Sequence, residues 1–313
     1  MTSHARRIPA ALLCLASLAL TAATCSPDPA PDPDAESSAS QSASSIFDGP
    51  SVKVAVKKGQ PGFNTRSGEE YEYAGFETDL LNSLADEIPF KEYAQDIPSL
   101  KREEILRDEG ADLVIATYTI TEARDEKVDF TAPYMKTYQG VLVRKDEDRI
   151  KKLDDLKGMK VCSASGSTSD PGSVESEEAK EAIRNGLGVG VDPGLRKDYK
   201  TCVKELAKGN FDAVWTDKIV LEGFAHQAPY DKDVKMLEDI TIGQRQLYGI
   251  GLREGHEADC RKLNKALKKF LDTRWRLTFQ QHFPALAEGD FEQKYKPSDA
   301  EFEDYRATSC GGR

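Results

Sequence analysis

The chain has 313 residues, of which 39% are apolar and 31% are charged, so it is long enough to fold as one large or two medium units. Its formal net charge of −11 at pH 7 and its pI near 5.1 give a soluble surface that repels nucleic acid. We therefore expect no nucleic-acid partner, and the spread of charges along the chain indicates a solvated surface.

The N-terminal segment has the pattern of an export signal. Arg6 and Arg7 precede an apolar stretch, residues 8–23, which matches the core of a signal peptide and is short for a membrane span. Small residues then lead to Cys25, in a run that resembles the cleavage site of bacterial lipoproteins. We expect a signal peptide over residues 1–24 and a lipid on Cys25 that holds the protein at the outer face of the bacterial cytoplasmic membrane. Secretion with release and twin-arginine export are the alternatives.

Residues 26 to about 47 are rich in Ser, Ala, Pro and Asp and have almost no apolar content. Such a segment cannot bury a core, so we expect a flexible tether over residues 25–49.

Four cysteines follow the tether, and an even number in an exported protein predicts two disulfides with three possible connectivities. Buried free thiols are the alternative. The cysteines are Cys162, Cys202, Cys260 and Cys310.

The folded part begins near Ser51 and contains two similar α/β units. In each unit a helical pattern ends at a glycine and an apolar strand follows, at Gly110–Val114 and again at Gly209–Val214. We therefore expect two lobes of similar design, with ligands beyond the carboxyl ends of their strands, at residues 117–119 and 216–217.

Two strand-like segments, residues 140–144 and 247–252, are expected to join the lobes. The expected division gives lobe 1 residues 50–143, lobe 2 residues 144–246, a return to lobe 1 over residues 247–305 and a tail over residues 306–313. One long helical pattern, residues 258–283, is expected to pack on lobe 1.

The segment from Ala116 to Tyr134 carries the chemistry of a carboxylate site. It follows a buried strand and opens a predicted helix whose free N–H groups attract anions. Arg124 lies in the first turn of that helix, where a guanidinium suits bidentate binding of a carboxylate. The alternative is a surface arginine paired with Glu122 or Asp125.

The run Thr119-Ile-Thr-x-x-Arg124, followed by Val128-Asp-Phe and Pro133-Tyr, resembles the signature of family 3 extracellular solute-binding proteins. These are the polar amino-acid receptors of ABC importers. The resemblance covers about residues 50–300 and includes four further runs, at residues 75–80, 155–161, 212–217 and 248–252. It implies an α/β, two-lobed periplasmic-binding-protein-like fold of type II with two hinge crossings. It also implies a free amino acid and an ABC permease in the membrane as partners. We expect a monomer without a cofactor. We expect no metal, because the histidines after the signal are too scattered for a metal motif; they are His226, His256 and His282.

Carried over residue by residue, the resemblance assigns the ligand α-carboxylate to Arg124, with Thr117 and Thr119 beside it. It assigns the α-ammonium to Asp217, for which the alternative role is the N-cap of the next helix. In lobe 2 the hydroxyls of Ser167 and Thr168 are expected to contact the carboxylate, and the alternative there is a plain turn.

The run from Lys57 to Gly62 resembles that of glutamate-binding importer subunits, and so do the runs at residues 162–168 and 199–202. Lys57 and Gln60 are therefore expected near the ligand side chain, where the cation of Lys57 matches an acidic group. Gly59 stands where that branch often has Asp, so aspartate, glutamine and asparagine remain open beside glutamate.

We expect the lobes to close by a hinge near residues 142–144 and 246–248. The predicted disulfides are Cys162–Cys202 and Cys260–Cys310, because neither pair then crosses the hinge. A sensor for a membrane kinase and an exported enzyme resembling cyclohexadienyl dehydratase are the alternative functions.

Overall fold

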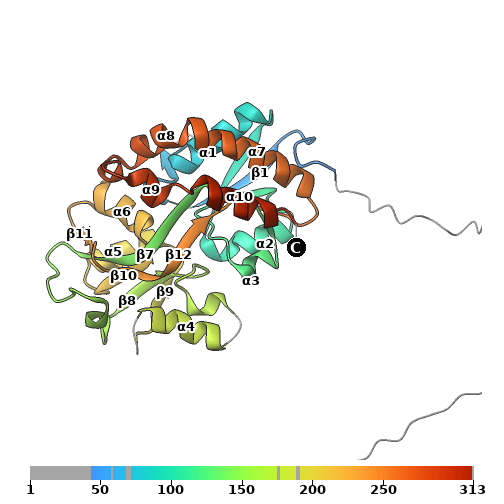
Figure 1. The fold of residues 1–313 in the computed structure, drawn as a ribbon. Coiled ribbons are helices and arrows are strands. Elements are labelled where there is room, and N and C mark those ends of the chain that lie inside the picture. The colour runs from blue at the N-terminus through green and yellow to red at the C-terminus, as the bar shows by residue number, and fades with distance from the viewer. Residues whose placement is uncertain (1–43, 58, 68–71, 175–176, 188–190, 312–313) are drawn as a thin grey trace, which may run out of the picture. The chain divides into compact units, whose positions relative to one another are not determined.

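The computed structural model describes residues 44–57, 59–67, 72–174, 177–187 and 191–311 (Figure 1). The predicted signal peptide, Cys25 and most of the predicted tether lie outside the described residues. The end of the predicted tether is described and belongs to the fold, because Ile46 is buried in the core and its N–H donates to Asp259 Oδ2 at 2.9 Å. The expected tether end at residue 49 and the expected start of the fold near Ser51 are therefore wrong, since an isolated pair of apolar residues in a polar segment gave no strand or helix pattern. The elements described below belong to one compact unit, Ser42–Arg313.

The first sheet has the strand order β4-β1-β5-β13-β6. Strand β1 is parallel to β4 and β5, and β13 is antiparallel to β5 and β6. The strands are β1 (Val52–Lys57), β4 (Glu92–Ile97), β5 (Leu113–Ile115), β6 (Asp129–Phe130) and β13 (Gly251–Leu252).

Successive residues of β1 face opposite sides of this sheet, as the alternation of side chains along a strand requires. Val54 and Val56 belong to the core that includes residues of α1 (Phe76–Glu87), α7 (Glu257–Thr273) and α8 (Trp275–His282). Ala55 instead belongs to a separate cluster with Leu106 of α2 (Arg102–Arg107). Helices therefore cover both faces, which explains why β5 is a continuous apolar run.

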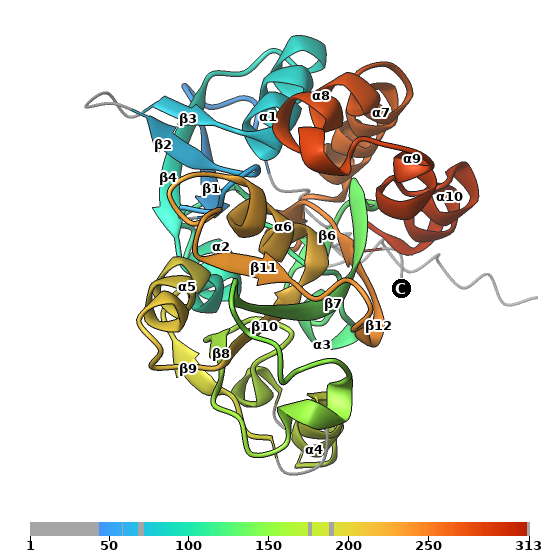
Figure 2. The same ribbon diagram turned by 90° about the vertical axis from the view of Figure 1, so that its left-hand side faces the viewer.

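The second sheet has the order β11-β7-β10-β8-β9, and β12 also pairs with β7. Its strands are β7 (Met135–Arg144), β8 (Val161–Ala164), β9 (Gly194–Arg196), β10 (Ala213–Asp217), β11 (Val234–Met236) and β12 (Ile242–Tyr248). Its helices are α4 (Glu177–Leu187), α5 (Tyr199–Ala207) and α6 (Lys218–His226). Figure 2 shows α1, α7 and α8 at the top and α4, β8 and β9 towards the opposite end.

The remaining elements are short or lie near the C-terminus. They are β2 (Thr65–Ser67), β3 (Glu72–Ala74), α3 (Glu122–Asp125), α9 (Phe291–Tyr295), α10 (Asp299–Thr308) and the 3-10 turns η1 (Ser99–Lys101), η2 (Leu153–Leu156), η3 (Pro171–Ser173) and η4 (Pro284–Leu286).

The chain passes between the sheets at residues 131–134 and 249–250, between β6 and β7 and between β12 and β13. The two passages lie side by side, because Tyr134 N–H donates to the Tyr248 carbonyl at 2.8 Å. The first passage precedes the expected boundary at 143/144 and the expected hinge at residues 142–144. Those residues end β7, where Leu142 pairs with Val214 and Met236 inside the second sheet. An apolar run predicts a buried strand, but its periodicity does not tell to which sheet the strand belongs.

The expected helix over residues 258–283 is two helices, α7 and α8, which meet at Arg274. Both pack against α1 in the first lobe, as expected. Phe76 of α1 lies against Trp275 and Phe270 with ring centroids 6.0 and 5.8 Å apart, so aromatic packing holds the C-terminal helices in place.

Both predicted disulfides are present. Cys162–Cys202 joins β8 to α5 with Cα atoms 5.6 Å apart, and Cys260–Cys310 joins α7 to the segment after α10 at 5.4 Å. The first bond lies wholly in the second lobe and the second at the C-terminal end of the chain, so neither joins the two sheets.

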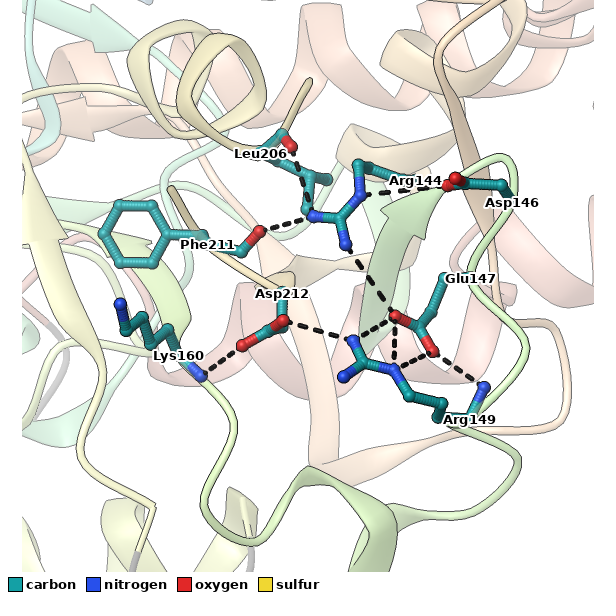
Figure 3. A network of polar contacts seen from close by, with 8 residues as sticks. All are labelled: Arg144, Asp146, Glu147, Arg149, Lys160, Leu206, Phe211 and Asp212. Atoms are coloured by element: carbon teal, nitrogen blue, oxygen red, sulfur yellow. Dashed lines mark hydrogen bonds and ion pairs between the residues drawn. The ribbon is translucent and has the colours of Figure 1, made fainter. Parts of the chain in front are cut away.

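A polar network fixes the loop after β7 to the rest of the second lobe (Figure 3). The buried carboxylate of Glu147 accepts hydrogen bonds from Arg149 Nε at 3.0 Å and Nη2 at 2.5 Å. Arg149 also pairs with Asp212 at 3.2 Å, and Asp212 accepts from the Lys160 amide at 2.9 Å. The Arg149 guanidinium lowers the pKa of Glu147 to about 2, so this carboxylate contributes stability to the lobe.

Candidate ligand site

A small cavity lies where the two sheets present the carboxyl ends of their strands. The first lobe contributes residues that follow β4 and β5, and the second contributes residues that follow β8 and end β10. The lining residues are Ser99, Arg102, Thr117, Thr119, Ser167, Thr168, Tyr199, Asp217 and Val220.

Thr117 has a backbone conformation that non-glycine residues rarely adopt, with φ of 42°. Three buried side chains hold it there. Its N–H donates to Glu77 Oε1 at 2.6 Å, its carbonyl accepts from Arg102 Nη1 at 3.0 Å, and its hydroxyl accepts from Gln60 Nε2 at 3.2 Å. Such a strained conformation persists only where its surroundings fix it, and it is often found at binding sites.

Arg102 is buried and lines the cavity, a role that the sequence analysis missed. Its guanidinium donates to the carbonyls of Ser99 at 3.1 Å, Ala116 at 3.2 Å and Gly166 at 2.9 Å, in addition to Thr117. The signal was available, because Arg102 follows β4 just as Thr117 follows β5. Residues that follow the carboxyl ends of strands are expected to form the site, and this rule therefore applies to Arg102 as well.

Arg124 is also buried, but it does not line the cavity. Its Nη1 donates to the Thr119 carbonyl at 2.9 Å and its Nη2 to the Gly166 carbonyl at 3.0 Å. Its Nε pairs with Glu103 at 3.1 Å. Arg124 lines a neighbouring groove together with Thr121 and Thr168, and Thr168 also lines the cavity.

Asp217 ends β10 and faces the cavity from the second lobe. Its Oδ2 accepts a hydrogen bond from the Tyr248 hydroxyl at 2.5 Å, while its buried Oδ1 accepts none from the part of the chain that the structure describes. Burial raises the pKa of Asp217 to about 6, against the opposite effect of the Tyr248 hydrogen bond. Asp217 is the N-cap residue of α6 but makes no side-chain cap hydrogen bond, so its Oδ1 is left as an open acceptor.

The turn between β8 and η3 brings two further predicted residues to the cavity. Ser167 Oγ donates to the Ala164 carbonyl at 2.7 Å, and Thr168 Oγ1 accepts from Gln139 Nε2 at 2.9 Å. Asp170 fixes the turn by accepting from the Gly166 amide at 2.7 Å.

Lys57 and Gln60 lie one contact behind the cavity wall. The Lys57 ammonium is buried and donates to Ser99 Oγ, which lines the cavity, and Gln60 contacts Thr117. Burial and the nearby guanidinium of Arg102 lower the pKa of Lys57 well below its ordinary value. Five of the predicted residues line the cavity: Thr117, Thr119, Ser167, Thr168 and Asp217. The other three contact its walls: Lys57, Gln60 and Arg124.

A two-lobed α/β fold with an enclosed polar site between the lobes is the architecture of periplasmic binding proteins. Residues 52–289 match the family model of bacterial extracellular solute-binding proteins, family 3, and the chain belongs to that family. Family members are extracellular, so the protein is an exported one.

The chain is 34% identical to the glutamate-binding protein GluB of Corynebacterium glutamicum over 231 residues, which cover 70% of this chain and 73% of GluB. Among solved structures it is similar to an ancestral arginine-binding protein bound to glutamine. That similarity has a TM-score of 0.64 and 30% identity, and it covers 75% of this chain and 98% of the other. It is also similar to the ancestral amino-acid-binding protein AncCDT-1, a precursor of cyclohexadienyl dehydratase. In that case the TM-score is 0.63 and the identity 25%, with coverage of 76% of this chain and 97% of the other.

Among the described residues, no helix is long and apolar enough to cross a membrane. The same residues contain no group of three or more His, Cys, Asp and Glu side chains arranged to hold a metal ion.

Proposed function

We propose that this protein is the receptor of an ABC amino-acid importer and that it holds L-glutamate in the cavity between its lobes. The observation that carries the proposal is the set of groups that surround the Arg102 guanidinium. Its buried guanidinium donates only to neutral carbonyls, and among the described residues no carboxylate lies within the 4.0 Å distance of an ion pair with it. A buried cation without a counter-ion is costly, and a ligand carboxylate in the cavity supplies that counter-ion.

The opposite charge is arranged on the other side of the same cavity. The open Oδ1 of Asp217 is an acceptor for an ammonium group. We therefore assign the ligand α-ammonium to Asp217 and the side-chain carboxylate to Arg102, with Ser99 positioned by Lys57 beside it. The α-carboxylate is assigned to Arg124, Thr119 and Thr168, with Thr117 and Ser167 completing the wall.

This assignment favours glutamate over its amide. The uncharged amide of glutamine provides a hydrogen-bond acceptor but no counter-ion, so Arg102 remains unpaired when glutamine is bound. The name of the relative GluB supports the same choice. Because Lys57 lies behind Ser99 and its pKa is lowered, we assign the dominant interaction with the side-chain carboxylate to Arg102 and a supporting role to Lys57.

The rest of the proposal concerns how the receptor is used. We propose a signal peptide over residues 1–24, a lipid on Cys25, a tether that follows Cys25 and ends before Ser45, and a monomer that delivers its ligand to a membrane permease. We propose binding without turnover, since the relatives named above are binding proteins. The lobes are proposed to close by rotation at residues 131–134 and 249–250.

A thermal-shift screen of the twenty amino acids against the mature protein tests the proposal. A ligand at 100 times its Kd stabilises the folded state by about 2.7 kcal/mol, which is readily detected as a rise in Tm. We expect L-glutamate to give the largest rise, and to be recovered unchanged by mass spectrometry. A larger rise with arginine, histidine or glutamine contradicts the ligand assignment, and conversion of the ligand contradicts the binding role.

A further inference from the structure

The turn between β8 and η3 makes an unusual contact across the two lobes. The carbonyl of Gly166, in the second lobe, accepts hydrogen bonds from Arg102 Nη2 at 2.9 Å and from Arg124 Nη2 at 3.0 Å. Both arginines belong to the first lobe, in α2 and α3. One backbone oxygen therefore receives two guanidinium groups, and both bonds are charge-assisted.

The same glycine lies directly against the main chain of the first lobe. Gly166 is buried and has φ of +75°, and a Cβ at this position would lie 2.4 Å from Leu100 Cα and 2.6 Å from Leu100 N. Leu100 is in η1, which leads into α2 and so into Arg102. Because the neighbouring atoms are main-chain atoms, they cannot rotate away as the end of a side chain can.

Two further contacts make the position of the carbonyl precise. Asp170 Oδ2 accepts a hydrogen bond from the Gly166 amide at 2.7 Å, and Asp170 Oδ1 accepts one from the Gly172 amide at 2.7 Å. The two oxygens of one carboxylate therefore fix the turn. The carbonyl is thus a fixed acceptor, and it reaches both arginines in the arrangement in which the turn rests on η1.

We propose that Gly166 is a positioning residue that couples closure of the lobes to the orientation of Arg102 and Arg124. This inference rests on the proposed function, because it takes both arginines as ligand-binding groups. The absence of a side chain allows the second lobe to approach η1 closely enough for its carbonyl to hold both guanidiniums. The arginines then have their ligand-binding orientation in the closed form, and the ligand and the carbonyl together secure them.

The substitution Gly166→Ala tests the coupling. Nonbonded carbon atoms approach to about 3.5–4.0 Å, so a Cβ at 2.4 Å from Leu100 Cα forces the turn and η1 apart by about 1 Å. Hydrogen bonds of 2.9 and 3.0 Å then lengthen to about 4 Å and are lost. We expect the affinity for L-glutamate to fall about 30-fold or more, since two charge-assisted bonds no longer form.

Gly158→Ala is the matched control. Gly158 lies in the same lobe with φ of +79°, but an added Cβ meets no atom within 4 Å. Alanine in the left-handed region strains the backbone similarly at both positions, and only Gly166→Ala adds the contact between the lobes. We expect Gly158→Ala to bind glutamate within about threefold of the wild-type protein.

Calorimetry gives the affinities, and small-angle scattering with and without saturating L-glutamate gives the closure. The inference predicts compaction on binding in the wild-type protein and in Gly158→Ala, and less compaction in Gly166→Ala. Equal affinity and equal compaction in the two variants overturn it. If the wild-type protein binds no glutamate, the proposed function fails instead, and the same comparison is made with the amino acid that the thermal-shift screen selects.

A third measurement needs no substitution and so does not depend on the folding of a variant. Protein labelled with carbonyl-13C glycine and 15N serine contains only two Gly-Ser pairs, Gly166-Ser167 and Gly172-Ser173, which makes both carbonyl resonances accessible by NMR. We expect ligand to shift the Gly166 carbonyl resonance more than that of Gly172. An unchanged Gly166 resonance on saturation with a ligand that binds contradicts the coupling.

Discussion

Replacing Arg102 with methionine separates the side-chain carboxylate from the rest of the ligand. Arg102 is 3% exposed and lines the cavity, so its charge is desolvated and its loss has a large effect. Removing one partner of a buried charge pair costs roughly 2–5 kcal/mol, which is about 30-fold to several-thousand-fold in glutamate affinity. The loss of a neutral hydrogen bond costs only about 1 kcal/mol, so we expect glutamine affinity to fall by about tenfold or less.

Calorimetric titrations of Arg102→Met with L-glutamate and L-glutamine measure the ratio of the two affinities. Arg107→Met is the control, because Arg107 lies on the same helix but is exposed and outside the cavity. We expect Arg107→Met to keep the wild-type ratio and Arg102→Met to lower it by about tenfold or more. An equal loss for both ligands in Arg102→Met shows that this arginine acts only through its bonds to the protein, and it refutes the side-chain assignment.

The remaining predictions concern single groups. Asp217→Asn is expected to abolish binding in calorimetry, yet to raise the free energy of unfolding by about 1–3 kcal/mol at pH 7.5. Burial raises the pKa of this carboxyl to about 6, so its ionised form destabilises the folded state at that pH. For the same reason wild-type affinity is expected to fall below about pH 6, and an affinity constant from pH 5 to 7 argues against the role of Asp217. The double variant Cys162→Ser/Cys202→Ser is expected to lose about 4 kcal/mol of stability in urea unfolding, because the bond closes a loop with a sequence separation of 40, while keeping glutamate affinity. Glu147→Gln is expected to lose about 1–3 kcal/mol at neutral pH without a change in affinity. The pKa of Glu147 is lowered to about 2, so its contribution to the free energy of unfolding is complete above the ordinary pKa of 4.5. This contribution disappears as the pH falls towards 2, and Glu147→Gln and the wild-type protein should therefore converge in stability near pH 2.

The elements that the sequence predicted well are those whose apolar pattern is local. The alternation of Val52, Val54 and Val56 placed β1, and the apolar run at Leu113–Ile115 placed β5 with helices on both faces. The disulfides followed from the division into lobes. The position of the lobe boundary did not follow, because the run at Val141–Val143 shows that a strand is buried but not which strands pair with it.

At the site, predicted residues that end strands were found around the cavity, as the geometry of open α/β sheets requires. Arg102 follows β4, so the same rule covers its place at the cavity, but its bond to the Gly166 carbonyl 64 residues away could not be predicted from a linear pattern. Glu77 was missed because it acts through a long-range contact, with the Thr117 amide 40 residues away. Such contacts follow from the packing of the fold, which a linear pattern does not contain.

The central claim is that a buried arginine, with no carboxylate of the described residues at ion-pair distance, selects an acidic amino acid. Calorimetric titration of the mature wild-type protein at pH 7.5 with L-glutamate and, in parallel, L-glutamine tests it most directly. We predict that glutamate binds at least about tenfold more tightly, because only its side-chain carboxylate pairs with Arg102. Equal affinity for the two amino acids, or tighter binding of glutamine, contradicts the claim.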